Sequence, residues 1–170
     1  MSRLHRYYVQ NGIYFITGVT KNRIKFFKET KNVDLFWSNL RKTKQNYSFR
    51  LFGYVLLLDH FHFLIQPKES SISTIIGSFK KRVSQEYKKI HEIDYQFILW
   101  QRRFWDHVIR NEDDLKFHLD YIHYNPVKHN YVDHPEDWNE TSFHIWLKKG
   151  EYEIGWGYRE LTELMNAKLD

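Results

Sequence analysis

Residues 60–65 constrain the fold of this chain more than any other segment, because their side chains alternate without a break. Successive side chains of a β-strand point to opposite faces of the sheet. One face of this strand would carry His60, His62 and Leu64, and the other would carry Phe61, Phe63 and Ile65. We expect the phenylalanine face to pack against helices, which places two imidazoles on the opposite face of a central strand.

The segments around this strand follow a definite order. Strands are predicted from β-branched and aromatic runs, and helices from apolar side chains at helical spacing. In chain order they are strand 13–20, helix 31–47, strands 50–58 and 60–66, helix 72–87, strand 104–109 and a last helix that begins at Asn111 and ends at Asn125-Pro126. The first six form the split βαβ order of a ferredoxin-like α+β domain with an antiparallel sheet, and the last is an additional C-terminal helix.

The domain organisation predicted for this chain is simple. With 170 residues and no low-complexity linker, the chain is long enough for one domain with a real core. Residues 1–132 are predicted to form that domain. Residues 133–170 carry several tryptophans without clear periodicity, and we expect them to form an aromatic tail that packs on the same domain.

Composition limits the possible chemistry and location. Cysteine is absent, which excludes disulfides, thiolate zinc sites and cysteine nucleophiles and is typical of a reducing compartment, so the cytoplasm is expected. No aliphatic run is long enough to span a bilayer, and no membrane partner is expected. The formal charge of +5 and the 18% aromatic content favour a polyanionic partner.

His60 and His62 are candidate ligands of one divalent cation, because they lie two residues apart on one face of a strand. Two neutral imidazoles need at least one more ligand, and an oxygen donor would suit Mg²⁺ or Mn²⁺. Zinc with a carboxylate ligand is an alternative. A polar sheet face with solvated histidines is the other interpretation of the pair.

The last predicted helix carries a candidate nucleophile. Leu115, Leu119 and Ile122 define its buried stripe, and Tyr121 lies at the edge of that stripe with Asn125 one turn later. Tyr124 is expected to point nearly opposite the buried stripe. A tyrosine hydroxyl can attack a phosphate beside a metal, and the Asn125 oxygen could be a metal ligand. The alternative is that Tyr121 is only a boundary residue of an amphipathic helix.

Two segments are candidates to bind single-stranded nucleic acid, which is held by neutralisation of its phosphates and by stacking of its bases. Charges on the second helix are weaker evidence, because exposed helix faces are commonly charged. The segment 100–105 is more specific, since paired arginines lie among aromatic residues. The candidate DNA-binding residues are Lys80, Lys81, Arg82, Arg102, Arg103, Trp105 and His107. For His107, a structural histidine with satisfied hydrogen bonds is the alternative.

Three motifs together resemble the REP-associated tyrosine transposases, within the single-tyrosine HUH transposase superfamily. They are Asp59-His-Phe-His62, the segment 99–110 (LWQRRFWDHVIR) and the segment 120–129 (DYIHYNPVKH). The start of the chain, Arg6-Tyr-Tyr and Tyr14-Phe-Ile-Thr, is also similar, and the match runs from about residue 6 to residue 147. The resemblance implies the HUH transposase fold.

For the site, the resemblance implies that His60 and His62 are metal ligands, that Tyr121 is the nucleophile and that Asn125 supplies a further polar ligand. It also implies cleavage of single-stranded DNA at hairpin-forming palindromes through a 5′-phosphotyrosine. Two departures from the family pattern are Leu58, where relatives commonly have proline, and the segment 139–141, where a Pro-aromatic-Ser pattern is usual.

The sequence thus predicts a metal-dependent single-strand DNA endonuclease and strand transferase, with Mg²⁺ or Mn²⁺ as cofactor. One alternative is a non-catalytic module of the same fold that binds hairpin DNA or structured RNA. Another is a metallohydrolase of small phosphorylated substrates, which would use a metal-bound water and form no adduct. Whether the protein is a monomer or a homodimer is left open by the sequence.

Overall fold

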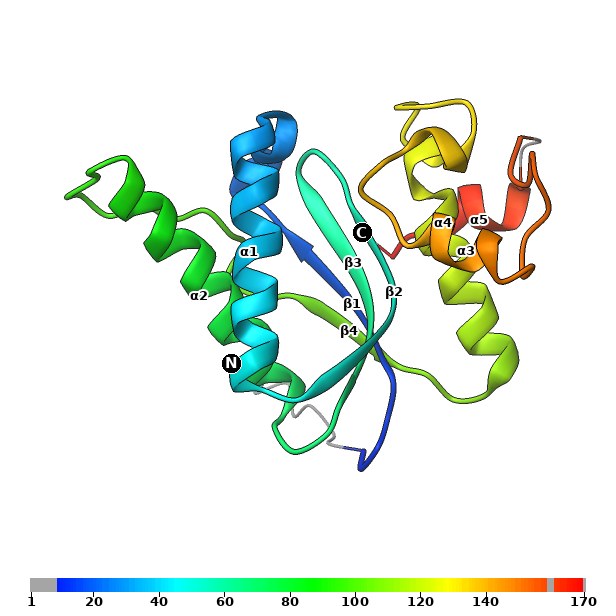
Figure 1. The fold of residues 1–170 in the computed structure, drawn as a ribbon, viewed down its shortest axis with the longest axis horizontal. Helices are drawn as coiled ribbons and strands as arrows, with labels where there is room; N and C mark the ends of the chain where they lie inside the picture. Colours follow the sequence, from blue (N-terminus) through cyan, green and yellow to red (C-terminus); the bar gives the residue numbers. More distant parts are fainter. Residues whose placement is uncertain (1–8, 159–160, 170) are drawn as a thin grey trace.

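A four-stranded antiparallel sheet separates two layers of helices in the computed structural model, which describes residues 9–158 and 161–169 (Figure 1). The residues of the Arg6-Tyr-Tyr motif lie outside the described residues. The strands are β1 (Tyr14–Val19), β2 (Phe49–Leu56), β3 (His60–Pro67) and β4 (Trp105–Val108). Their spatial order is β2-β3-β1-β4, so β3 is a central strand, and the predicted ferredoxin-like topology is confirmed.

The helices divide between the two sides of the sheet (Figure 1). On one side lie α1 (Thr30–Asn46) and α2 (Ile72–Ile90), and on the other α3 (Glu112–Lys128), α4 (Phe143–Lys148) and α5 (Thr162–Asn166). Single 3-10 turns are at Lys21–Arg23, Phe26–Lys28 and Pro135–Asp137. Within the part of the chain that the structure describes, no helix has both the length and the apolarity to cross a membrane.

The layer of α1 and α2 buries the phenylalanine face of β3, as the alternation predicts. Phe61 and Phe63 both lie against Phe79 of α2 and Phe36 of α1, with ring centroids 4.5–6.2 Å apart within this group. A Cβ built at Gly18 would come within 2.3 Å of the Phe61 ring, so only glycine lets β1 pass this ring. Each fully buried phenylalanine contributes about 1.5–3 kcal/mol to stability.

The opposite layer places α3 against the histidine face. A Cβ at Gly53 of β2 would lie 2.7 Å from Leu119 of α3, so glycine allows the helix to approach the sheet closely. On this face His62 of β3, Thr17 of β1 and Trp105 of β4 form one cross-strand row. Helix α3, both histidines and the edge-strand tryptophan therefore share one side of the sheet.

Helix α3 begins where the sequence predicts but ends later. Asn111 caps it, because its Oδ1 accepts a hydrogen bond from the Asp114 N–H at 2.8 Å. The prediction that Asn125-Pro126 ends the helix is wrong, since the helix continues to Lys128 with Pro126 inside it. Proline removes one backbone donor, yet the last turn is retained by bonds such as His129 N–H to the Asn125 carbonyl at 3.0 Å.

Burial of Tyr124 is the second difference from the sequence-based expectation. Its side chain is buried, although the helical wheel places it opposite the stripe of Leu119 and Ile122. The residues after 133 cover this other side of α3, and the Tyr124 hydroxyl accepts a hydrogen bond from the Leu161 N–H at 3.4 Å. A wheel assumes one buried face, whereas α3 lies between the sheet and the C-terminal segment.

Candidate active site

The orientation of His60 is set by its neighbour Asp59, which lies in the turn between β2 and β3. The Nδ1–H of His60 donates to the Asp59 carboxylate at 2.5 Å, and Arg23 forms an ion pair with the same carboxylate at 3.2 Å. Burial alone would raise the pKa of Asp59, but His60 and Arg23 outweigh it and lower this pKa below its ordinary value. The ionised carboxylate leaves the lone pair of His60 on Nε2, in the interior of the protein.

The orientation of His62 is set by Thr17 of β1. The Thr17 hydroxyl donates to the Leu169 carbonyl at 2.7 Å and lies 2.9 Å from Nδ1 of His62. Because its own hydrogen is used for Leu169, the Thr17 oxygen accepts the Nδ1–H of His62. The lone pair of His62 is therefore also on Nε2, and both fully buried rings are fixed as potential metal ligands.

Tyr121 packs directly beside this histidine pair. Its ring centroid lies 5.4 Å from that of His62, and the His60 and His62 centroids are 5.0 Å apart. The Nζ of Lys128 donates to the Tyr121 hydroxyl at 2.9 Å and lies 4.6 Å from the centroid of the Tyr121 ring. The structure thus brings together three residues predicted from the sequence and adds a cation at the phenol oxygen.

Lys128 was missed at the sequence level for a specific reason. Seven residues separate it from Tyr121, which is nearly two helical turns and puts both on one helix face. The prediction ended the helix at Asn125-Pro126, which left Lys128 outside it. The spacing between Tyr121 and Lys128 is the signal that could have revealed the pair.

Asn125 follows Tyr121 by one turn and is completely buried. Among the described residues, neither its Oδ1 nor its Nδ2 has a hydrogen-bond partner. An amide left without hydrogen bonds in the interior costs about 1–3 kcal/mol, so such a group signals a ligand or a functional requirement. His129 lies nearby, with its ring centroid 5.0 Å from that of His60, and has no role in the sequence-based prediction.

The basic residues of α2 are not part of this site. Lys80 is buried, and its Nζ donates to the Gln101 carbonyl at 2.8 Å, which corrects the expectation that it belongs to an exposed basic surface. Its Nζ also lies 5.8 Å from the centroid of the Trp100 ring. Lys81 is exposed and Arg82 is partly exposed, but both belong to the helix layer on the other side of the sheet from Tyr121.

In the second predicted DNA-binding segment, Arg102 and Arg103 line a hollow with residues of α2, whereas Trp105 lies on the histidine face of the sheet. Arg102 and Arg103 are exposed, and the adjacent Gln101 N–H donates to the Val19 carbonyl of β1 at 2.9 Å. Trp105 is 44% exposed and lies two strands from His62 on the same sheet face. His107 is only partly exposed, and its Nε2 is 2.8 Å from an Asp114 carboxylate oxygen.

Comparisons with known proteins agree with this fold. The sequence model of the family described as "Transposase IS200 like" matches residues 8–125. An Escherichia coli K12 protein named REP-associated tyrosine transposase is 32% identical over 156 residues, which cover 92% of this chain and 91% of the relative. A Haemophilus influenzae protein with the same name, given provisionally, is 36% identical over 166 residues, covering 92% and 94%.

A solved structure extends the likeness to three dimensions. It is described as a REP-associated tyrosine transposase bound to a REP hairpin, and it shares 30% identity with this chain at a TM-score of 0.80. The match covers 95% of this chain and 96% of the solved one. The fold and the site define a tyrosine transposase, an enzyme of DNA rearrangement. Within that class, the chain belongs to the IS200-like transposases and to their REP-associated tyrosine transposase group.

Proposed function

We propose that this protein cleaves and rejoins single-stranded DNA at hairpin-forming sequences, with Tyr121 as the nucleophile. The observation that carries the proposal is the packing of Tyr121 against His62, with Lys128 donating to its hydroxyl. The hairpin substrate is supported by the solved relative, which is described as bound to a REP hairpin. The residue set and the DNA class therefore point to the same reaction.

In the proposed reaction, the Tyr121 oxygen attacks the scissile phosphorus, and the bond from phosphorus to the 3′ oxygen of the preceding nucleotide breaks. The DNA then carries a 5′-phosphate ester on Tyr121 and a 3′-hydroxyl on the released strand. The proton lost by the phenol balances the proton that the 3′ oxygen takes up. Attack of a 3′-hydroxyl on the ester reverses these changes and joins strands without an external energy source.

The residues present fit a divalent metal ion. Asn125 has a buried amide without hydrogen bonds in the described part of the chain, and both histidines are held with Nε2 as the lone-pair atom. His60, His62 and Asn125 would hold Mg²⁺ or Mn²⁺. These ions prefer oxygen ligands, which the Asn125 amide oxygen and the substrate phosphate would supply. A bound ion of this kind would supply Lewis-acid polarisation of the scissile phosphate.

Lys128 acts on the nucleophile itself in this proposal. Its ammonium donates to the Tyr121 oxygen, so it stabilises the negative charge that forms when the phenol loses its proton. The same ammonium donates to the Ala167 carbonyl at 2.5 Å, which fixes its position. Lys128→Gln is expected to lower the rate of adduct formation by about 10²-fold. Lys116→Gln, an exposed lysine of α3, is the matched control and should leave that rate unchanged.

Single-stranded DNA is proposed to reach Tyr121 over the β4 edge. Trp105 offers an exposed ring for base stacking, and the exposed Arg102 and Arg103, which precede it in the chain, would neutralise phosphates of the same strand. Adjacent strands are about 4.8 Å apart, so Trp105 lies roughly 10 Å from β3, close to the reach of one or two nucleotides. Lys80 is not included, because its ammonium is used inside the protein.

The deciding experiment uses 5′-labelled and 3′-labelled single-stranded hairpin DNA with Mg²⁺ or Mn²⁺, analysed on a denaturing gel. Wild type should form a metal-dependent covalent adduct, and Tyr121→Phe should form none while still binding the hairpin. Tyr124→Phe is the matched control, because Tyr124 is also buried on α3 but faces the C-terminal segment. An adduct that persists in Tyr121→Phe would disprove the assignment, and hairpin binding without any adduct would favour a non-catalytic module.

A further inference from the structure

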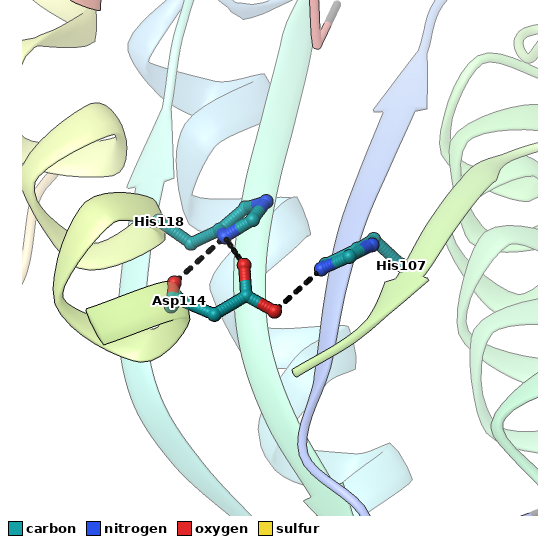
Figure 2. Close-up of side chains that lie close together, drawn as sticks. All are labelled: His107, Asp114 and His118. Carbon is teal, nitrogen blue, oxygen red and sulfur yellow. Dashed lines mark hydrogen bonds and ion pairs between the residues drawn. The ribbon is translucent and has the colours of Figure 1, made fainter. Parts of the chain in front are cut away.

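A second cluster of potential metal ligands joins β4 to the first two turns of α3 (Figure 2). His107 projects from β4, and Asp114 and His118 lie one turn apart on α3. One ligand atom of each residue lies within 4.8 Å of the others. The cluster contains none of the residues that we assign to DNA cleavage.

The carboxylate of Asp114 lies between the two imidazoles (Figure 2). One of its oxygens is 2.8 Å from His107 Nε2, and the other is 3.1 Å from His118 Nδ1. In a tetrahedral zinc site with bonds of about 2.0–2.1 Å, neighbouring ligand atoms are roughly 3.3 Å apart. The three ligand atoms therefore lie within about 1.5 Å of that spacing. Because the Nδ1–H of His118 donates to the Asp114 backbone carbonyl at 2.8 Å, an ion bound at this nitrogen would replace that hydrogen bond.

The rings are already held in place. The centroids of His107 and His118 are 4.7 Å apart with the planes inclined by 15°, and Trp105 stacks on the outer side of His107 at 6.1 Å. His118 also packs on Phe15 at 4.8 Å and is almost completely buried. The backbone N–H of Arg110 donates to the Asp114 carboxylate at 2.9 Å, and this bond helps to fix the orientation of the carboxylate.

We propose that His107, Asp114 and His118 bind a divalent transition-metal ion of the zinc class and that this ion fastens the nucleophile helix to the sheet edge. Two histidines and one carboxylate are a ligand set that zinc accepts, and the partial exposure of His107 leaves room for a water as fourth ligand. His118 precedes Tyr121 by one turn. Ion binding would therefore fix the segment of α3 that leads directly to the nucleophile.

The effect of the ion would pass to the reaction centre through Phe15. This ring lies 4.8 Å from His118, 5.2 Å from His62 and 5.9 Å from Tyr121, measured between centroids. Binding at the cluster is thus a positioning device next to the catalytic residues. It does not depend on the proposed cleavage reaction, because zinc binding is measured without DNA.

The test is isothermal titration of the purified protein with ZnCl₂, together with visible absorption after addition of CoCl₂. Wild type should bind two ions per chain, one at His60 and His62 and one at the second cluster. His62→Gln and His107→Gln should each bind one, and the cobalt spectrum of tetrahedral coordination should persist in His62→Gln and disappear in His107→Gln. His91→Gln, which changes an exposed histidine outside both clusters, is the control and should bind two.

A second variant distinguishes loss of a metal ligand from loss of folding. Asp114→Asn keeps hydrogen-bonding capacity but removes the anionic ligand, so it should lose the same ion while its circular dichroism matches that of wild type. Zinc should also slow hydrogen exchange in residues 112–121 of wild type but not in Asp114→Asn. If both variants bind as many ions as wild type, the three side chains form a hydrogen-bonded clamp only, and the proposal is overturned.

Discussion

Phe61 and Phe63 on one face of β3 contact aromatic rings of α1 and α2, whereas His60 and His62 on the other face contact hydrogen-bonding groups and Tyr121. All four side chains are completely buried. Burial alone therefore does not distinguish core from site. The difference lies in the partners, because apolar rings are satisfied by packing while each buried imidazole needs a specific acceptor at Nδ1.

The comparison teaches that one strand can serve stability and chemistry at alternate positions. Substitutions on the phenylalanine face should act mainly on the free energy of unfolding. Substitutions on the histidine face should act mainly on adduct formation. Four predictions follow, of which three test this separation and one tests a buried histidine of α3.

Phe63→Ala is expected to have the largest effect. Its ring fills space between Phe36 and Phe79, so truncation should lower the free energy of unfolding by about 3–5 kcal/mol. Urea denaturation followed by circular dichroism measures the loss. Trp105→Ala, which removes an exposed ring from the edge strand, should cost less than about 1 kcal/mol. Equal losses in the two variants would refute the assignment of Phe63 to the stabilising face.

His62→Gln should separate the two faces most clearly. Removing this proposed metal ligand is expected to lower the rate of adduct formation by about 100-fold or more, while the free energy of unfolding changes by less than about 1 kcal/mol. The rate is measured with labelled hairpin DNA, and the stability with urea. A variant that unfolds as readily as Phe63→Ala would show that the histidine face is as important for stability as the opposite one.

A third prediction concerns His123, a buried polar group of α3 that faces the C-terminal segment. Its Nδ1 is 3.0 Å from the Tyr152 hydroxyl, which donates to Asp120, and its Nε2 is 2.8 Å from the Ser142 hydroxyl. Burial, and secondarily the nearby His144, lowers the pKa of His123 from 6.5 to about 3. The ring is therefore neutral in the folded protein over the range in which it is charged in the unfolded chain.

As the pH falls, the His123 imidazole becomes protonated in the unfolded chain before it does so in the folded protein. The contribution of His123 to the free energy of unfolding is therefore fully present above pH 6.5 and is lost as the pH decreases toward 3. At pH 5 the protonation of His123 lowers the free energy of unfolding by about 2 kcal/mol relative to neutral pH, because each pH unit below 6.5 costs about 1.4 kcal/mol. Urea midpoints between pH 7.5 and 5 measure it. His123→Gln should flatten the profile, and His91→Gln should not. A profile unchanged by His123→Gln would assign the acid sensitivity to other groups.

Thr17→Val should produce the smallest of the four effects. Valine keeps the shape of threonine but removes the acceptor for Nδ1 of His62, so the ring loses its fixed tautomer. Adduct formation is expected to fall about 10-fold and metal affinity by a similar factor. Thr17→Ser restores the hydroxyl and should recover most of the activity. A failure of serine to rescue would mean that side-chain shape, and not the hydrogen bond, explains the loss.

Local sequence patterns predicted much of this molecule. The alternation at 60–65 predicted a central strand with phenylalanines facing helices, and the element order predicted the ferredoxin-like topology. The helical spacing from Leu115 to Asn125 selected Tyr121 as the tyrosine beside the sheet. These features follow from periods of about two and 3.6 residues, which are properties of the backbone and are visible in any single segment.

Partners distant in the sequence could not be predicted in this way. Thr17 and His62 are 45 residues apart and meet only because β1 and β3 pair in one register. Tyr124 was predicted to point away from the buried stripe, and no local pattern shows that the C-terminal segment covers this outer side of α3. Lys80 looked like a surface cation, and only the path of the chain before β4 brings the Gln101 carbonyl to its ammonium.

The sequence by itself therefore determined which residue types face which side of each strand and helix, because side-chain direction depends on local backbone geometry. The tertiary structure decided which of these groups meet. It placed Lys128 at the Tyr121 hydroxyl by continuing α3 through Pro126, and it brought His107 of β4 to Asp114 of α3. Such contacts depend on long-range packing of whole elements, whose free energy no single segment contains.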